Sequence, residues 1–212
     1  MSSDTSPGVE VEIKLGLVNP EQRDALLAAL PPSTHTLVQD NYYFDTSAGR
    51  LSRARIMLRI RYEAGAEQVT GRAVMAAKRR RSRTDAGRFE ADEIEHIMEP
   101  ETWRAVVTGS LNAAQLDNPV TRWVNAEVGP IENLEILGLV SNERIVVPAA
   151  GYIFEVDRTR FPDGSVDVEV EVETDDIDGA RAAVEQYARK AGVALFEQTK
   201  GKHRRFRERL GR

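Results

Sequence analysis

Residues 9–15, Val-Glu-Val-Glu-Ile-Lys-Leu, alternate apolar and ionised side chains with the two-residue period of a β-strand. The same alternation returns at residues 168–173 with carboxylates, and at residues 58–61 with guanidinium groups. One such strand alone is typical of a half-buried sheet with a solvated face. Several strands with a charged face, some acidic and some basic, instead predict a shared polar surface that binds metal ions together with a polyanion.

The amino-acid composition limits which metal ligands and nucleophiles such a surface can contain. The chain has no cysteine, which excludes disulfides, thiolate metal sites and a cysteine nucleophile. Its histidines, His35, His96 and His203, lack the spacing of zinc ligands. A bound metal would therefore sit among oxygen ligands, which suits Mg²⁺ or Mn²⁺.

The 212 residues suit a single domain spanning residues 1–212, and no linker interrupts them. Within it we expect a helical insertion at about residues 99–130 and a basic C-terminal tail at about residues 200–212. The start of the chain is short and polar, unlike a signal peptide, and no apolar run approaches membrane-spanning length, so a cytoplasmic protein without a membrane partner is expected. The net charge of −5, and a tail without interleaved aromatic residues, argue against a nucleic-acid partner.

The remaining elements follow from periodicity and from helix start and stop signals. Asn19 and Pro20 begin a helix that stops at Pro31, and Asp178 caps another that ends at Gly192. Prolines 100 and 119 begin two helical segments that carry Trp103 and Trp123, which we expect to cover the apolar outer side of the sheet. Further strands are expected at residues 36–46, 56–62, 68–80, 87–97 and 153–161, with one or two more at 134–147.

The charged side chains on these strand faces need ions of opposite charge. Glu10 and Glu12 would lie about 6.6 to 6.8 Å apart on one face of a strand, and carboxylates so close repel one another unless a divalent ion neutralises them. The basic residues exceed what these carboxylates could pair with, so an added anion such as a linear polyphosphate is implied. They are Arg59, Arg61, Lys78, Arg80, Arg88, Arg144 and Lys200. The alternative is a mosaic of surface salt bridges, each worth about 0–1 kcal/mol.

The motifs, taken in order, resemble those of the CYTH superfamily, the triphosphate tunnel metalloenzymes. Glu10-x-Glu12-x-Lys14 is similar to its N-terminal ExExK signature, and Tyr42-Tyr43-Phe44-Asp45-Thr46 to its YYDT-like strand. Further matches run from Val9 to about Lys202. They are Leu58-Arg59-Ile60-Arg61, Lys78, Arg88-Phe89-Glu90, Arg144, Asp157, the strand Glu169-Val170-Glu171-Val172-Glu173, and Thr199-Lys200 in place of the terminal Ser-Lys.

The resemblance implies an α+β fold: a closed antiparallel β-barrel of about eight strands that forms a polar tunnel, with helices packed outside. It implies metal ligands among Glu10, Glu12, Asp157, Glu169, Glu171 and Glu173. It implies triphosphate contacts from Lys14, Arg59, Arg61, Lys78, Arg80, Arg88, Arg144 and Lys200. The residues closest to the chemistry would be Glu10, Glu12, Lys14, Lys78 and Lys200, and strand parity selects Arg80 over Arg79 and Arg81.

The expected activity is metal-dependent hydrolysis of a small-molecule triphosphate, foremost inorganic triphosphate to diphosphate and phosphate. A thiamine triphosphatase and a class IV adenylyl cyclase are the alternatives within the family, and a non-catalytic polyphosphate- or nucleotide-binding module is the alternative outside enzymes. Apolar outer surface left uncovered by helices would also allow a symmetric homodimer.

Overall fold

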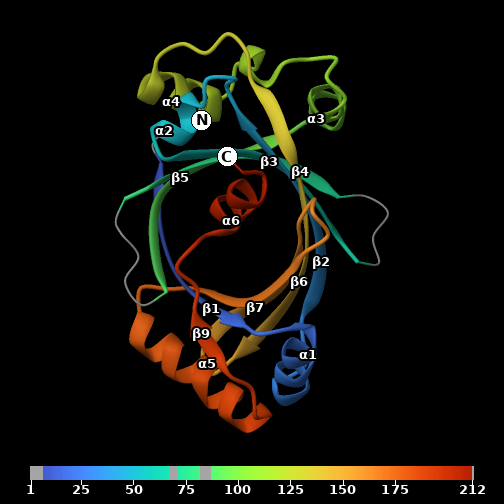
Figure 1. Cartoon of the computed structure of the whole chain (residues 1–212), viewed down its shortest axis with the longest axis vertical. Coiled ribbons are helices and arrows are strands. Elements are labelled where there is room, and N and C mark those ends of the chain that lie inside the picture. Colours follow the sequence, from blue (N-terminus) through green and yellow to red (C-terminus); the bar gives the residue numbers. More distant parts are fainter. Residues whose placement is uncertain (1–6, 67–70, 82–86, 212) are drawn as a thin grey trace.

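The computed structural model describes residues 7–66, 71–81 and 87–211, and its centre is a closed antiparallel barrel of eight strands (Figure 1). Neighbouring strands follow the order β5-β4-β3-β2-β6-β7-β8-β1, and pairing of β1 with β5 closes the ring. The strands are β1 (Gly8–Leu17), β2 (His35–Asp45), β3 (Ile56–Gly65), β4 (Arg72–Arg80), β5 (Arg88–Met98), β6 (Glu135–Ala149), β7 (Tyr152–Arg160) and β8 (Val166–Glu173). The fold class expected from the sequence is therefore confirmed.

The first strand has three partners because two strands share one of its edges. Its first half pairs with β5, from Gly8 to Ile13, and its last residues, Leu15 to Leu17, pair with the short strand β9 (Leu195–Glu197). Its other edge pairs with β8. The ladder on the β5 side thus continues into β9.

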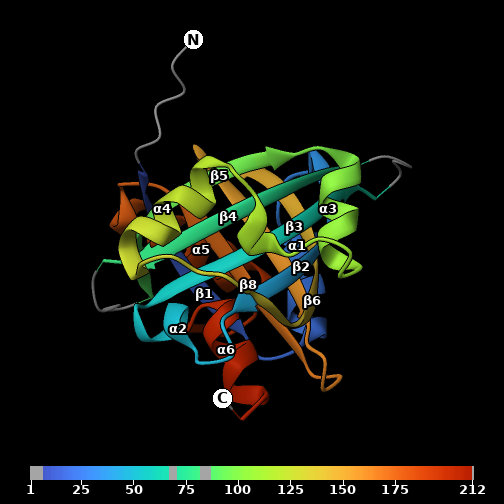
Figure 2. The same ribbon diagram turned by 90° about the horizontal axis from the view of Figure 1, so that it is seen from above.

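Helices cover the apolar outer faces of the strands on two sides of the barrel (Figures 1 and 2). On one side α3 (Pro100–Val107) and α4 (Pro119–Val128), with α2 (Arg50–Arg53), pack on β3, β4 and β5. On the other, α1 (Pro20–Ala29) and α5 (Ile177–Ala191) pack on β1, β7 and β8. Where the covered face of a strand is apolar, as on β1, β3 and β8, its charged face points into the barrel.

Both tryptophans lie outside the barrel, as expected. Trp103 stacks on Tyr62 with ring centroids 4.8 Å apart, and Arg79 lies 5.6 Å from the centre of the Trp123 ring. The prolines predicted to start helices occupy the first turns of α1, α3 and α4. Asn118 caps α4 through a capping box with Thr121, which explains where that helix begins.

The basic tail predicted at residues 200–212 forms a helix, α6 (Lys202–Arg209), which lies across one end of the barrel (Figure 1). Phe206 anchors it in a cluster with Tyr43, Val140 and Phe161. Strand β6 makes room with Gly138, where an added Cβ would lie 3.0 Å from the Phe206 ring. The tail is thus part of the barrel's packing rather than a solvated extension.

Three boundaries differ from the sequence-based expectations. The residue that caps α5 is Asp176, whose carboxylate accepts a hydrogen bond from the Gly179 amide, and Asp178 lies in the first turn. The segment predicted as one or two strands at 134–147 is the single strand β6, with a register shift opposite residues 43 and 44. The predicted start of the fourth strand, at residue 68, lies outside the described residues.

Among the residues described, no helix has the length and apolar character needed to span a membrane.

Candidate active site

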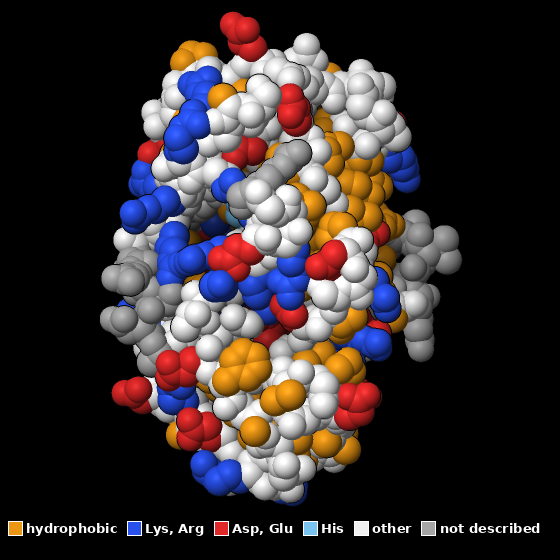
Figure 3. Space-filling view, in the orientation of Figure 1, with side chains coloured by type: hydrophobic (Ala, Val, Ile, Leu, Met, Phe, Trp, Pro, Cys, Tyr) orange, Lys and Arg blue, Asp and Glu red, His pale blue; other side chains and the backbone are white. Residues whose placement is uncertain are grey.

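The inward faces of the barrel strands enclose a cavity of about 850 Å³. Cross-strand register brings opposite charges together: Lys14 on β1 lies opposite Glu171 on β8, and Arg144 on β6 lies opposite Asp157 on β7. Residues opposite one another in a ladder share a face, so these side chains point into the same space. In the space-filling view, Lys and Arg side chains gather around the hollow in the middle of this face (Figure 3).

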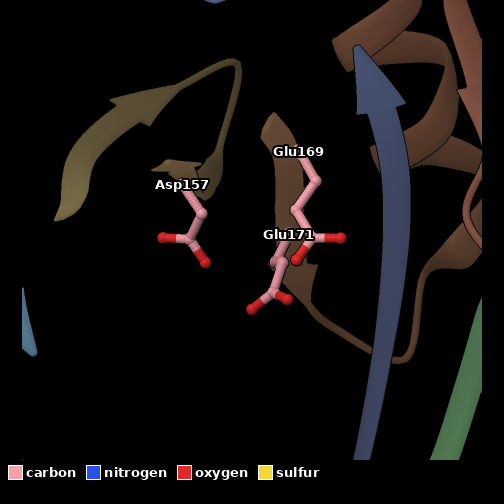
Figure 4. Close-up of side chains that lie close together, drawn as sticks. All are labelled: Asp157, Glu169 and Glu171. Carbon is pink, nitrogen blue, oxygen red and sulfur yellow. The ribbon is translucent and has the colours of Figure 1, made fainter. Parts of the chain in front are cut away.

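One group of predicted metal ligands consists of Asp157, Glu169 and Glu171, whose carboxylate oxygens lie within 4.8 Å of one another (Figure 4). All three are buried. Lys202 of α6 lies among them, 2.7 Å from Asp157, 2.6 Å from Glu169 and 2.5 Å from Glu171. Arg205 binds Glu169 through two hydrogen bonds of 2.7 and 2.8 Å.

This first group is compensated by the chain's own cations. Burial alone would raise the pKa of Glu171, but Lys14, Lys202 and Arg144 outweigh it and hold that pKa well below its usual range. Arg144 and Lys202 likewise hold the pKa of Asp157 low against the effect of burial. Asp157 and Glu171 are therefore ionised, and all three carboxylates are already paired with cations of the chain, so a metal ion among them would compete with Lys202.

A second group of carboxylates, Glu10, Glu12 and Glu173, has less compensation. Burial raises the pKa of Glu12 to about 7, with Lys14 opposing the rise and the Glu171 and Glu10 carboxylates adding to it. Burial, followed by repulsion from Glu10, also raises the pKa of Glu173. Burial is the main cause of both shifts, and neighbouring carboxylates add to them, so an added cation beside Glu12 and Glu173 would favour their ionised forms.

The donor set of this second group fits a hard divalent cation. Carboxylate oxygens are the ligands that Mg²⁺ and Mn²⁺ take in proteins, and a cation here would offset the burial and repulsion that raise these pKa values. Lys78 lies at its edge, paired with Glu10 and, at 3.1 Å, with Glu93. Of the two groups, the one around Glu10 and Glu12 has the greater need for an added positive charge.

The opposite wall of the cavity carries arginines with few partners. Arg59 forms no hydrogen bond or ion pair with any residue that the structure describes, and its buried Nε atom is unpaired. Arg61 contacts Glu63 at 3.3 Å, yet burial and the positive charge of Arg59 lower its pKa to about 10. Two adjacent buried guanidinium groups with so few anionic partners favour binding of an anion between them and the carboxylate wall.

Most of the residues selected from the sequence line this cavity. Asp157 and Glu169 are buried beside Glu171, and Glu173 lies opposite Glu12 in the ladder, but none of the three is in the lining. Two more residues lie away from it. Lys200 lies outside it and pairs with Glu208 at 2.8 Å, while Lys202, two residues on, enters the carboxylate group. Arg88 faces outward, opposite the buried Ile13, and contacts Glu90 at 3.5 Å. The strand that carries Arg88 therefore has its predicted inner and outer faces reversed.

The prediction from strand parity for the dense basic run agrees with the geometry. Arg80 lines the cavity, whereas Arg79 and Arg81 both contact Asp92 on the outer face, at 3.1 and 2.5 Å. The remaining residues of the run, 82 and 83, lie outside the described residues.

Several cavity residues were not selected from the sequence. Phe89 projects inward, with Lys14 Nζ 5.3 Å and the Arg80 guanidinium 5.4 Å from the centre of its ring. His203 on α6 lies against Tyr43, their ring centroids 4.9 Å apart, and its Nε2 atom is buried without a hydrogen-bond partner among the described residues. The two-residue period could have found Phe89, but nothing in the sequence separates His203 from a solvated tail.

Asp45, in the YYDT-like segment, has a structural role. Its carboxylate accepts hydrogen bonds from the backbone amides of Leu51 and Ser52, at 2.9 and 3.1 Å, and from the Ser52 hydroxyl. Asp45 thereby ties the end of β2 to the short helix α2, which leads the chain into β3. Of this motif, Tyr43 alone lines the cavity.

The comparisons with known proteins agree with this architecture. The CYTH domain family matches residues 8–204, and the chain belongs to this family. Among solved structures it is similar to HpAC1 from Hippeastrum, a putative adenylyl cyclase described as having a dominant triphosphatase activity. The two are 27% identical, with a TM-score of 0.84, over 94% of this chain and 95% of that one.

More distant structures share the fold. A putative adenylate cyclase from Bacillus halodurans is 21% identical, with a TM-score of 0.69, over 94% of this chain and 98% of its own. The protein PH1819 from Pyrococcus horikoshii is 16% identical, with a TM-score of 0.59, over 94% and 99%. No curated protein sequence matched the chain significantly.

Proposed function

We propose that the chain hydrolyses inorganic triphosphate to diphosphate and phosphate, and that this activity requires Mg²⁺ or Mn²⁺. The observation that carries the proposal is that one cavity contains both arginines available to bind an anion and carboxylates available to bind a cation. Arg59 has no anionic partner among the described residues, and the two lysines that pair with Glu10 and Glu12 are shared with other carboxylates. A triphosphate together with a divalent ion supplies both.

In this proposal Glu10, Glu12 and Glu173 hold the divalent ion. When bound, the ion supplies a water of lowered pKa and screens the charge of the phosphates. The group of Asp157, Glu169 and Glu171 serves chiefly to fix Lys14, Arg144 and Lys202, whose ammonium and guanidinium groups it holds in place.

The other side chains position the substrate. Arg59 and Arg61 bind non-bridging phosphate oxygens from one wall, and Lys14, Lys78 and Arg144 bind them from the carboxylate wall. Burial would lower the pKa of Lys14, but the Glu12 and Glu171 carboxylates raise it above its usual value, so this ammonium stays charged. Such a fixed cationic frame stabilises charge that develops on the transferred phosphoryl group, which is the main contribution of proteins to this chemistry.

The substrate is the least constrained part of the proposal. The dominant triphosphatase activity described for HpAC1 supports a hydrolase over a cyclase. Arg55, Arg80, Arg204 and Arg207 line the cavity beside Phe89, which disfavours the cationic rings of thiamine triphosphate at that end. A binding module without catalysis is the alternative from another class.

Phosphate release from inorganic triphosphate, thiamine triphosphate and ATP, with Mg²⁺, with Mn²⁺ and with chelator, tests these alternatives side by side. We expect fast, metal-dependent release from inorganic triphosphate. Dominant formation of cyclic AMP from ATP would contradict the proposal. Tight triphosphate binding without release from any substrate would favour the binding module.

A further inference from the structure

His203 is the second residue of α6, the helix that lies across one end of the barrel (Figure 1). Its side chain lines the cavity, and the centre of its ring lies 4.9 Å from that of Tyr43 and 6.5 Å from that of Phe206. The residue before it, Lys202, is held by ion pairs with the carboxylates of β7 and β8. Contacts on both sides therefore fix the position of this imidazole on the cavity wall.

The Nε2 atom of His203 is buried and has no hydrogen-bond partner among the described residues. Most buried polar atoms in folded proteins are paired, so one that is not calls for an explanation. Packing does not supply it, because a phenylalanine would contact the rings of Tyr43 and Phe206 equally well. An unpaired nitrogen of a side chain that lines a cavity points instead to a partner that the cavity admits.

Arg59 lies beside the same tyrosine. It is opposite Tyr43 in the β2–β3 ladder, lines the same cavity, and has a buried Nε atom that is also unpaired. Its charge acts on His203. Phosphate oxygens accept hydrogen bonds from guanidinium and imidazole nitrogens alike, and one phosphate has enough oxygens for both. The two unpaired groups next to Tyr43 therefore suit a single phosphate.

The charged and titratable groups around His203 come from β2, β3 and α6, and they are Tyr43, Asp45, Arg59 and Arg207. Burial, followed by Arg207, lowers the pKa of His203 to about 4, with Arg59 adding to this and Asp45 opposing it. The imidazole of the free protein is therefore neutral at pH 7. A phosphate beside it would bring a negative charge, which favours the protonated ring.

We propose that His203 is a substrate-binding residue, which together with Arg59 binds one phosphate group of the triphosphate and takes up a proton from solvent as it does so. The inference rests on the proposed function and adds a neutral side chain of α6 to the phosphate site. No bond of the substrate changes in this step. The proton joins the free ring nitrogen, so the bound imidazolium has two N–H donors. Triphosphate affinity therefore rises with acidity wherever the bound ring is protonated and the free ring is neutral.

The first test follows the ring nitrogens of His203 by NMR in the full chain, with chelator present so that binding is measured without turnover. The chain has three histidines, and the His203 signals are those that His203→Gln lacks. We expect saturating triphosphate to raise the pKa of His203 by about 2, as a close opposite charge does. His35 and His96 are exposed and outside the cavity lining, so they serve as internal controls that should not respond.

The second test measures triphosphate binding by calorimetry, again with chelator. His203→Phe keeps a ring against Tyr43 but removes both nitrogens, and it should weaken binding at pH 7 about tenfold. His203→Gln places an amide near the Nε2 position, so its affinity at pH 7 should stay within about threefold of wild type. Between pH 7 and pH 5.5 the wild-type affinity should gain about fourfold over that of His203→Gln. His96→Phe is the matched control and should bind like the wild type.

An unchanged pKa of His203 in saturating triphosphate would overturn the inference, as would wild-type affinity in His203→Phe, even if the chain hydrolyses triphosphate. A purely structural role of His203 would leave its ring neutral in the complex. A chain that binds triphosphate with this proton uptake but releases no phosphate would overturn the proposed hydrolysis alone. Failure of the wild-type chain to bind triphosphate would overturn both.

Discussion

Lys202 on α6 lies 2.7 Å from Asp157, a carboxylate with no exposed surface on the neighbouring wall of the barrel. The same ammonium contacts Glu169 and Glu171, so a single side chain from α6 links three carboxylates of β7 and β8. The C-terminal helix is thereby bound to the interior of the barrel by charge as well as by the packing of Phe206.

Replacing Lys202 with methionine should destabilise the fold strongly. The change leaves Asp157 and Glu169 buried with one cation fewer, and breaking a buried ion pair from one side costs about 3 kcal/mol or more. Chemical denaturation should show a fall of this size in the free energy of unfolding. Lys200→Met, which removes only an exposed contact with Glu208, should change it by less than about 1 kcal/mol. Equal effects of the two substitutions would contradict the placement of Lys202.

Replacing Glu12 with glutamine should weaken binding of a divalent ion about 10- to 100-fold and reduce triphosphate hydrolysis accordingly. The amide keeps the shape of the side chain but removes the charge that the ion neutralises. Calorimetric titration with Mn²⁺ and phosphate release measure the two effects. Glu21→Gln, on the exposed face of α1, provides the control. Unchanged hydrolysis in Glu12→Gln would exclude Glu12 as a metal ligand.

The affinity for the metal should depend on pH because burial raises the pKa of Glu12 to about 7. Below pH 7 the carboxyl group of the free protein holds a proton that the ion must displace, so the affinity should rise up to about tenfold per pH unit and level off above pH 7. Titrations in buffers of different ionisation enthalpy should detect this released proton. A flat affinity between pH 5 and pH 7 would show that Glu12 carries no such proton.

His203 should make the protein less stable in acid. Burial, followed by Arg207, lowers its pKa to about 4, with Arg59 adding to this and Asp45 opposing it. A group whose pKa is lower in the folded state binds its proton more readily when unfolded. Its contribution is therefore present above about pH 6.5 and lost as the pH falls toward 4.

Between pH 7 and pH 5 this corresponds to about 2 kcal/mol of unfolding free energy. His203→Gln should abolish that part of the pH dependence, which urea denaturation of both proteins at the two pH values would measure. The same loss in both proteins would show that other groups cause it.

Arg79 and Arg80 should respond oppositely because they face opposite sides of β4. Arg80→Gln, which changes the cavity lining, should weaken triphosphate binding several-fold. Arg79→Gln should leave binding unchanged and lower the unfolding free energy by up to about 1 kcal/mol, through lost contacts with Glu127, Asp92 and the Trp123 ring. Binding calorimetry and thermal unfolding of both variants separate the two outcomes.

The two-residue period predicted the inner faces of β1, β3 and β8 because these strands alternate charged and apolar residues without interruption. It failed on β5, where Arg88, Glu90 and Asp92 on one face compete with Glu93 and Glu95 on the other, and composition does not decide which face turns inward. Only the register with β1, which sets Arg88 opposite Ile13, settles this.

The choice between Lys200 and Lys202 could not be made from the sequence for a different reason. The helix that carries Lys202 is highly polar, and its one buried apolar residue, Phe206, packs against Tyr43 and Phe161. Local propensity contains no information about such a contact, because its partners are more than 40 residues away along the chain. For the same reason, the sequence could not place His203 beside Tyr43.

Helix α6 also orders the events of folding. It follows every barrel strand along the chain, yet it carries Lys202 and Arg205, which neutralise carboxylates that β7 and β8 bury. While the chain is being synthesised, Glu169 therefore lacks these two counter-charges until α6 has left the ribosome. The last segment of the barrel to be made is thus the one that completes the charge balance of an early buried carboxylate.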